Sequence, residues 1–283
     1  MTDTDSSRRP GPWDRKTEPA APIEPGATPP PPANSPTAVA GQNPLALLGG
    51  SALLFGFAFL FTQNLVMAVA IVWGVLVHEY GHVLAMNRVG IGPATMHVTL
   101  FGGLAKARRL PDSEWHSVLV ALAGPFFGLL AAIPFFALYL GTGGAEWLLG
   151  AVAIAALNLI NLAPAPPLDG SRALGPVLAR IHPMLERVAM VAVGVAVVWW
   201  GVATQQWFIV IFVAIAMVGH LKRGAWRPAG RDLTVREAFS SFGLFLLTAA
   251  ACAAVAVAAL MPLAEGSLQD ALRIAGAYLG VRT

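Results

Sequence analysis

Long blocks of apolar residues, separated by short polar connections, dominate the chain from about residue 45 onward. A helix of about 20 apolar residues is long enough to cross the ~30 Å hydrocarbon core of a bilayer. Seven stretches reach or approach this length, at residues 45–62, 64–87, 117–140, 146–163, 187–204, 206–221 and 241–262. The pattern therefore predicts an all-α polytopic membrane protein with about six to seven transmembrane helices.

The two ends of the chain depart from this pattern. Residues 1–43 are polar and rich in Pro, Ala, Ser and Thr, with no apolar segment of the kind that secretory signals carry. They predict a disordered, proline-rich tail, which we interpret as a spacer, although its proline run also matches ligands of aromatic-lined grooves. In the C-terminal tail, 263–283, residues 267–280 predict a weakly amphipathic helix on the outer surface. The membrane domain is thus expected at 44–262.

Charged residues fix the expected orientation. The chain is 56% hydrophobic and 12% charged, which is typical of a multi-spanning membrane protein. Most of the 18 lysines and arginines fall in the N-terminal tail and in three segments, 88–116, 171–187 and 222–236. By the positive-inside rule, the tail and these segments are cytoplasmic in a multi-pass protein of the cell membrane. The net charge of +3 is explained by arginines beside anionic lipid and requires no nucleic-acid partner.

One apolar stretch, VLVHEYGHVLAM at residues 75–86, contains charged and metal-binding side chains. His78 and His82 are four residues apart, so on a helix both imidazoles can reach one metal ion. Glu79 can accept a proton from a water on that metal, and this H-E-x-x-H spacing is the arrangement of zinc proteases. Two buried structural histidines are the alternative, but a carboxylate near mid-bilayer costs about 2.5–3.5 kcal/mol and is retained mainly for function. We predict one Zn2+ per chain.

A zinc site that performs chemistry needs three protein ligands and one open position. Asp169 ends the run NLINLAPAPPLDG, 158–170, in which three prolines cannot continue a regular helix. Non-helical backbone at membrane depth is tolerated where it is buried in protein or lines a watery cavity. We therefore predict that Asp169 joins His78 and His82 as the third ligand. Capping of the following helix by Asp169 is the alternative.

Three motifs together resemble those of the site-2 protease family of intramembrane zinc metalloproteases, peptidase family M50. They are HEYGH (78–82), AGPFFG (123–128) and NLAPAPPLDG (161–170), and the resemblance covers about residues 50–190, with the core motifs at 75–170. It implies zinc ligands at His78, His82 and Asp169 and a catalytic role for Glu79. It also implies that Asn161 positions the substrate backbone or the oxyanion, with an interhelical hydrogen bond as the alternative.

The resemblance implies a function in regulated intramembrane proteolysis. The expected substrate is a single-pass membrane protein, such as an anti-sigma factor or a membrane-tethered regulator, cleaved within or near its transmembrane segment on the cytoplasmic side. A metal transporter would also place His and Asp in a membrane but gives no reason for Glu79, and an inactive site-2-protease-like regulator would be expected to lack Glu79 or a ligand. Members often carry a PDZ or CBS domain, and we expect neither in this chain. Many members also have an asparagine near the position of Gly128. The sequence does not indicate the oligomeric state.

A short hairpin is predicted between the second and third spans. In ATMHVTLFGGLAKARR, 94–109, the apolar Met96, Val98 and Leu100 alternate with polar residues ahead of a turn at Gly102–Gly103. The resemblance implies that this hairpin dips into the membrane. We expect Met96, Val98 and Leu100 to position the substrate, because a transmembrane helix must unwind before cleavage and can then pair with an edge strand. Unchanged cleavage with proline at 96, 98 or 100 would contradict this expectation.

Overall fold

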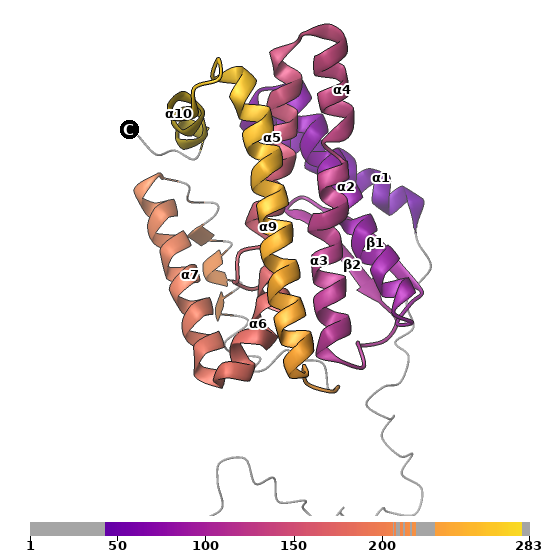
Figure 1. Ribbon diagram of the computed structural model, residues 1–283. Coiled ribbons are helices and arrows are strands. Elements are labelled where there is room, and N and C mark those ends of the chain that lie inside the picture. Colours follow the sequence, from indigo (N-terminus) through magenta and orange to yellow (C-terminus); the bar gives the residue numbers. More distant parts are fainter. Residues whose placement is uncertain are drawn as a thin grey trace, which may run out of the picture. The chain divides into compact units, whose positions relative to one another are not determined.

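The computed structural model describes residues 43–205, 207, 210–211, 213–215, 217–218 and 230–278. The helices and strands are α1 Pro44–Thr62, α2 Leu65–Arg88, β1 Ala94–Thr99, β2 Gly102–Ala107, α3 Glu114–Leu130, α4 Ile133–Thr142, α5 Ala145–Asn161, α6 Asp169–Ile181, α7 Pro183–Ala203, α9 Val235–Leu263 and α10 Leu268–Tyr278 (Figure 1). The predicted tail before residue 43 and half of the residues of the predicted span 206–221 lie outside the described residues.

The predicted multi-pass helical architecture is confirmed for the part of the chain that the structure describes. Five segments are long and apolar enough to cross a membrane, namely α1, α2, the run Glu114–Thr142 that contains α3 and α4, α7 and α9. Helix α5 is apolar but, at 17 residues, shorter. These helices begin and end within several residues of the predicted stretches, because an apolar run of this length leaves little choice of structure in a bilayer.

Local chemistry sets the helix boundaries. Side-chain oxygens of Asn43, Asn64 and Ser113 accept hydrogen bonds from backbone N–H groups in the first turns of α1, α2 and α3. The predicted span 117–140 is interrupted, since α3 ends at Leu130 and α4 begins at Ile133 with Pro134 in its first turn. Proline has no N–H to bond to the preceding turn, so a break at this point is favoured.

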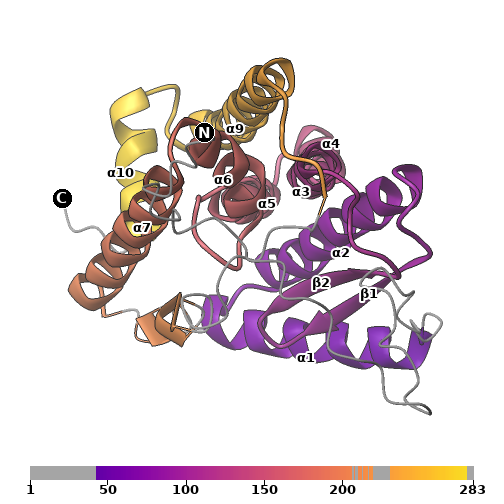
Figure 2. The ribbon, with the colours of Figure 1, turned by 90° about the horizontal axis from the view of Figure 1, so that it is seen from below.

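Helix α2 is the central element of the fold. It packs against α1, α3, α5 and both strands, while α9 packs against α3, α5 and α6 (Figures 1 and 2). Ala70 of α2, Ile154 of α5 and Ala259 of α9 share one buried cluster, and Cys252 of α9 is buried with Val118 of α3 in another. Small side chains at these contacts allow membrane helices to approach closely. The helices that carry the candidate site are therefore held in one packed unit.

The predicted hairpin is present, with a different turn. Strands β1 and β2 pair antiparallel from Ala94 opposite Ala107 to Thr99 opposite Gly102. The turn is at residues 100–101, so Leu100 lies beyond the end of β1, and the expected turn at Gly102–Gly103 was wrong by two residues. Gly102 does adopt a positive φ of 130°, but it does so as the first residue of β2.

The hairpin lies between α1 and α2 (Figure 2), with β1 in contact with α1 and with α2. The Val98 carbonyl lies so close to Gly50 of α1 that a side chain at position 50 would collide with it. The Val98 side chain is buried with Leu54 and Val75. Helix α1 therefore covers β1 on one side.

Two further elements follow the core helices. Residues 162–168 are non-helical, as the prolines predict, and α6 then begins at Asp169, outside the predicted spans. Helix α10 matches the helix expected within 267–280, and its Ala271 packs against Leu260 and Ala264 at the end of α9.

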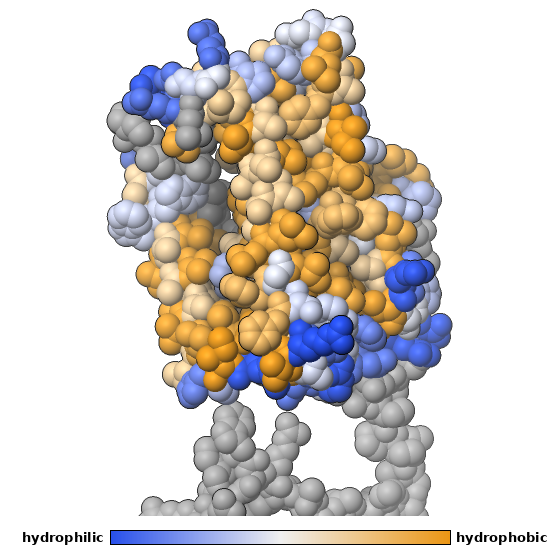
Figure 3. All heavy atoms as spheres, in the orientation of Figure 1, coloured by the Kyte–Doolittle hydropathy of each residue, from blue (hydrophilic) through white to orange (hydrophobic). Residues whose placement is uncertain are grey.

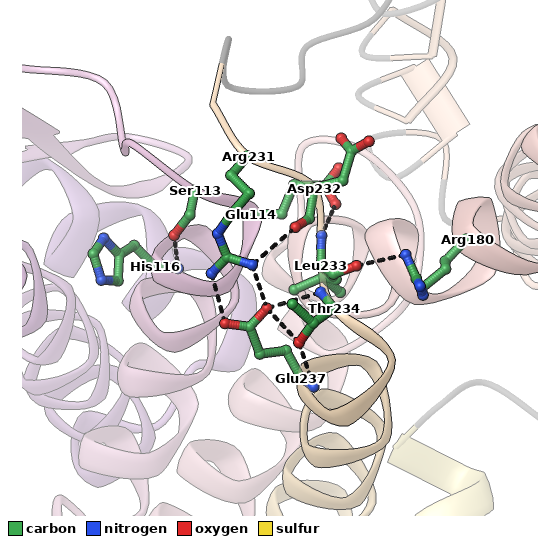
Figure 4. A network of polar contacts seen from close by, with 9 residues as sticks. All are labelled: Ser113, Glu114, His116, Arg180, Arg231, Asp232, Leu233, Thr234 and Glu237. Atoms are coloured by element: carbon green, nitrogen blue, oxygen red, sulfur yellow. Dashed lines mark hydrogen bonds and ion pairs between the residues drawn. The ribbon is translucent and has the colours of Figure 1, made fainter.

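Residues 230–234, which we call the clasp, tie the start of α9 to α3 and α6 (Figure 4). The Arg231 carbonyl accepts a 3.0 Å hydrogen bond from the backbone N–H of Glu114. The backbone N–H of Leu233 donates to the Glu114 carboxylate over 3.0 Å, and the Leu233 carbonyl accepts from Arg180 Nη1 over 2.6 Å. Thr234 and Glu237 form a capping box that starts α9. The peptide groups of one buried residue, Leu233, thus join three helices.

Candidate metal centre

Helix α2 places the three residues of the H-E-x-x-H motif together. His78, Glu79 and His82 are 3%, 7% and 7% exposed, although all three carry ionisable groups that face the interior of an apolar helix bundle. One ligand atom from each lies within 4.8 Å of the others, so the group could hold a metal ion. The helical repeat brings His78 and His82 to one face, as their spacing predicts.

Asp169 reaches the same point from the first residue of α6. Its Oδ2 atom lies 3.0 Å from Nε2 of His78 and 3.2 Å from Nε2 of His82. The two Nε2 atoms are 3.1 Å apart. The structure therefore brings together the three side chains that were predicted as ligands, although His78 and Asp169 are 91 residues apart in sequence.

Hydrogen bonds on the far side of each imidazole fix which nitrogen faces this centre. Nδ1 of His82 lies 2.8 Å from the carbonyl oxygen of Val120, which can only accept, so Nδ1 carries the proton and donates. Nδ1 of His78 lies 2.9 Å from Oδ1 of Asn158. The Asn158 amide is oriented by its Nδ2, which donates to the Ile154 carbonyl over 2.8 Å, so its oxygen accepts from His78. Both Nε2 atoms therefore present lone pairs to Asp169.

This arrangement fits a bound cation. Two imidazole lone pairs and a carboxylate oxygen repel one another at 3.0–3.2 Å unless a positive charge lies between them. In tetrahedral zinc sites, bonds of about 2.0–2.2 Å place neighbouring donor atoms roughly 3.3–3.5 Å apart. The observed triangle is close to that spacing, and two nitrogens with one carboxylate oxygen are donors that zinc accepts.

Asn158 is a site residue that the sequence did not single out. It is fully buried and bonded to His78, whereas the half-buried Asn161 donates its side-chain amide to the Leu157 carbonyl of its own helix. A signal for Asn158 exists in the sequence, since it continues the buried stripe of Ala151, Ile154 and Ala155 at helical spacing. The role predicted for Asn161, contact with the substrate, stays a prediction.

Replacement of Asn158 by leucine is expected to lower zinc affinity about 10- to 100-fold, because the His78 ring loses the acceptor that fixes its tautomer and orientation. Competition against a chromophoric chelator, with the purified full chain, measures this affinity. Asn161→Leu is the matched control, three residues along the same helix, and its zinc affinity is expected to stay at the wild-type value. Equal affinities for wild type and Asn158→Leu would contradict the assigned contact.

Two glycines form walls of the centre. A Cβ atom at Gly124 of α3 would collide with the rings of both His78 and His82, and one at Gly103 of β2 would collide with the Glu79 side chain. The strand that lies beside the candidate base is therefore β2. The three residues predicted to position the substrate lie elsewhere, since Met96 is half-buried on β1, Val98 is buried against α1 and α2, and Leu100 is in the turn.

Residues 66–154 match the family model described as peptidase family M50. This stretch of the chain, residues 66–154, belongs to peptidase family M50. The chain is 33% identical over 124 residues to sll0528 of Synechocystis, a protein described as a candidate zinc metalloprotease, and 30% identical over 124 residues to Rip3 of Mycobacterium tuberculosis, described in the same way. These matches cover 42% and 41% of this chain but 32% and 31% of the relatives, so the shared stretch is about a third of the length of each.

Among solved structures, a site-2 protease from Methanocaldococcus jannaschii aligns with 71% of this chain and 100% of its own, at 15% sequence identity and a TM-score of 0.45. One departure from the M50 pattern has a physical counterpart here. A Cβ atom at Gly128 would collide with the Asn158 amide. The space beside Gly128, near which many members have an asparagine, is thus filled by an amide from α5.

Proposed function

We propose that this chain is an intramembrane zinc metalloprotease that hydrolyses peptide bonds within or near transmembrane segments of membrane proteins. The observation that carries the proposal is the triangle of His78 Nε2, His82 Nε2 and Asp169 Oδ2 with Glu79 beside it, on a helix apolar enough to cross a membrane. The relatives described as candidate zinc metalloproteases support the reaction class.

His78, His82 and Asp169 would hold the zinc ion. When bound, zinc polarises a carbonyl and lowers the pKa of a water toward ~7, which supplies a nucleophile at neutral pH. Glu79 accepts the proton of the attacking water and delivers it to the leaving amine. Asn158 and the Val120 carbonyl keep both imidazoles in the tautomer that this arrangement needs. Burial of all four ionisable groups strengthens their electrostatic interactions, because bulk water does not screen them.

The substrate is proposed to be a single-pass membrane protein, such as an anti-sigma factor or a membrane-tethered regulator, and the process regulated intramembrane proteolysis. Its unwound segment would pair with the hairpin. The position of Gly103 against Glu79 favours the backbone of β2 for this pairing, while α1 covers part of β1. Prolines at 103 and 105 are therefore more informative substitutions than those at 96, 98 and 100.

The multi-pass chain is proposed to lie in the cell membrane with its N-terminus and the metal centre toward the cytoplasm. Support comes from the lysines and arginines, most of which fall in the tail and in alternate connections. The side of the membrane that each connection occupies can be read by labelling of single introduced cysteines from outside.

Cleavage of transmembrane peptides by the purified full chain in liposomes tests the function. We expect cleavage inside the apolar segment, loss of cleavage with a zinc chelator, and recovery when zinc is added back, because the ligand set needs its ion. Mass spectrometry of the products locates the cut. A chain that carries zinc yet cleaves none of a broad panel, or whose cleavage resists complete removal of metal, would contradict the proposal.

A further inference from the structure

A concave feature lies away from the metal centre, between the C-terminal half of α6 and the start of α9. This groove has a volume of about 320 Å³. Leu174, Leu178 and Ile181 of α6 face Phe239 and Phe242 of α9 across it, and its walls are almost entirely apolar. It is separate from the catalytic proposal, since none of its lining residues belongs to the metal centre.

The rim of the groove carries large apolar side chains that are open to the surroundings. Ile181, Val235 and Phe239 are 71%, 57% and 76% exposed. Figure 3 shows that apolar residues cover the sides of this face and that hydrophilic residues gather at its lower end. Exposed apolar surface of this extent marks contact with another molecule or with lipid.

The length of α9 places the groove at a membrane boundary. At 1.5 Å per residue, this 29-residue helix is about 43 Å long, which exceeds the ~30 Å hydrocarbon core. With its axis along the membrane normal, about one turn at each end would lie at headgroup level. Val235 is in the first turn, next to the clasp, and Phe242 is about two turns further along, so the groove runs from the headgroup region into the hydrocarbon.

One positive charge lies at the end of this groove that is next to the clasp. Arg180 lines it, is exposed, and donates Nη1 to the Leu233 carbonyl over 2.6 Å (Figure 4). The carboxylates that form ion pairs among residues 43–205 and 230–278 pair with groups other than Arg180. Glu237, for example, pairs with Arg231 over 2.7 Å. The Arg180 guanidinium has five N–H donors and uses one in this hydrogen bond. Its charge and remaining donors suit a phosphate group.

We propose that this groove binds one anionic phospholipid, with an acyl chain between α6 and α9 and the phosphate at Arg180. An extended peptide is a poorer occupant, because apolar walls would leave its backbone N–H and C=O groups without partners. An acyl chain has no polar group to satisfy. Since the clasp contacts Arg180 through Leu233, the bound headgroup would lie where α6 and α9 are already joined.

Native mass spectrometry of the delipidated full chain tests this proposal by titration with phosphatidylglycerol and phosphatidylcholine of identical acyl chains. For wild type we expect one phosphatidylglycerol to bind about fivefold more tightly than phosphatidylcholine, since one arginine near a membrane surface contributes this much. Arg180→Gln should remove the preference, and Arg180→Lys should retain most of it. Arg172→Gln, an exposed arginine on the same helix, is the charge control and should leave the preference intact.

A second pair of variants tests the acyl-chain part. Ala238 lines the groove, so Ala238→Trp should fill it and weaken binding of both lipids, whereas Ala253→Trp, at an exposed position of α9, should not. Equal affinity of wild type for both lipids would overturn the proposal, as would a preference that survives Arg180→Gln. Equal effects of the two tryptophans would also overturn it. Thermal unfolding in the same detergent establishes that each variant is folded.

Discussion

Replacement of Glu79 by glutamine is expected to lower kcat for cleavage of a transmembrane peptide by about 10²- to 10⁴-fold while the protein keeps its zinc. Glutamine has nearly the size of glutamate, so it fits beside Gly103, but its amide cannot accept a proton from the attacking water. His78, His82 and Asp169 are untouched, so the metal site should persist. Single-turnover cleavage in liposomes measures the rate, and elemental analysis of the same sample measures the zinc.

Tyr80→Phe is the control for this substitution, since Tyr80 is the next residue of α2 and is 52% exposed. Its kcat and zinc content are expected to match those of wild type. If Glu79→Gln cleaved at the wild-type rate, Glu79 would not be the base. If the variant had lost its zinc, the lower rate would result from the missing metal ion and not from the missing base, so the result would not support the role assigned to Glu79.

Removal of the Asp169 carboxylate by Asp169→Ala is expected to lower zinc affinity more than 100-fold. This effect is larger than the one expected for Asn158→Leu, because Asp169 would bind the ion directly and Asn158 only orients His78. Two imidazoles would remain, with no anionic ligand to offset the charge of the ion. Cleavage should fall with zinc content. Competition against a chelator measures the affinity, and Asp112→Ala, which removes an exposed carboxylate, should leave it unchanged.

The structure separates this ligand role from a role in capping α6. The residue that caps α6 is Leu168, and no side chain accepts a capping hydrogen bond there. The zinc-free forms of wild type and Asp169→Ala are therefore expected to unfold at nearly the same temperature in detergent. A large loss of stability in the zinc-free variant, with zinc affinity preserved, would show that Asp169 acts on the helix and not on the metal.

Local patterns predicted much of this fold. An apolar run of about 20 residues has few alternatives to a membrane helix, and α1 and α2 accordingly begin and end close to the predicted 45–62 and 64–87. Alternation of Met96 and Val98 with polar neighbours predicted the hairpin. The spacing of His78 and His82, and the prolines before Asp169, are also local features, which is why these candidates could be named without a structure.

Contacts between distant segments were beyond this approach. Asn158 and Asn161 are both polar residues near the end of one apolar helix. The rotation of α5 about its axis, relative to α2, decides which of them contacts His78, and Asn158, the one that does, is 80 residues away in sequence. That rotation depends on packing, which a single sequence does not specify. The clasp was missed for the same reason, since Glu114 and Leu233 lie 119 residues apart.

The glycine walls at positions 103 and 124 have a consequence for inhibition. Because Gly103 and Gly124 have no side chains, the centre is bounded on these two sides by the main chain of β2 and α3. A chelating compound that enters would therefore meet peptide groups on these two sides, and discrimination among such compounds would depend on their hydrogen-bonding pattern more than on the shape of their substituents.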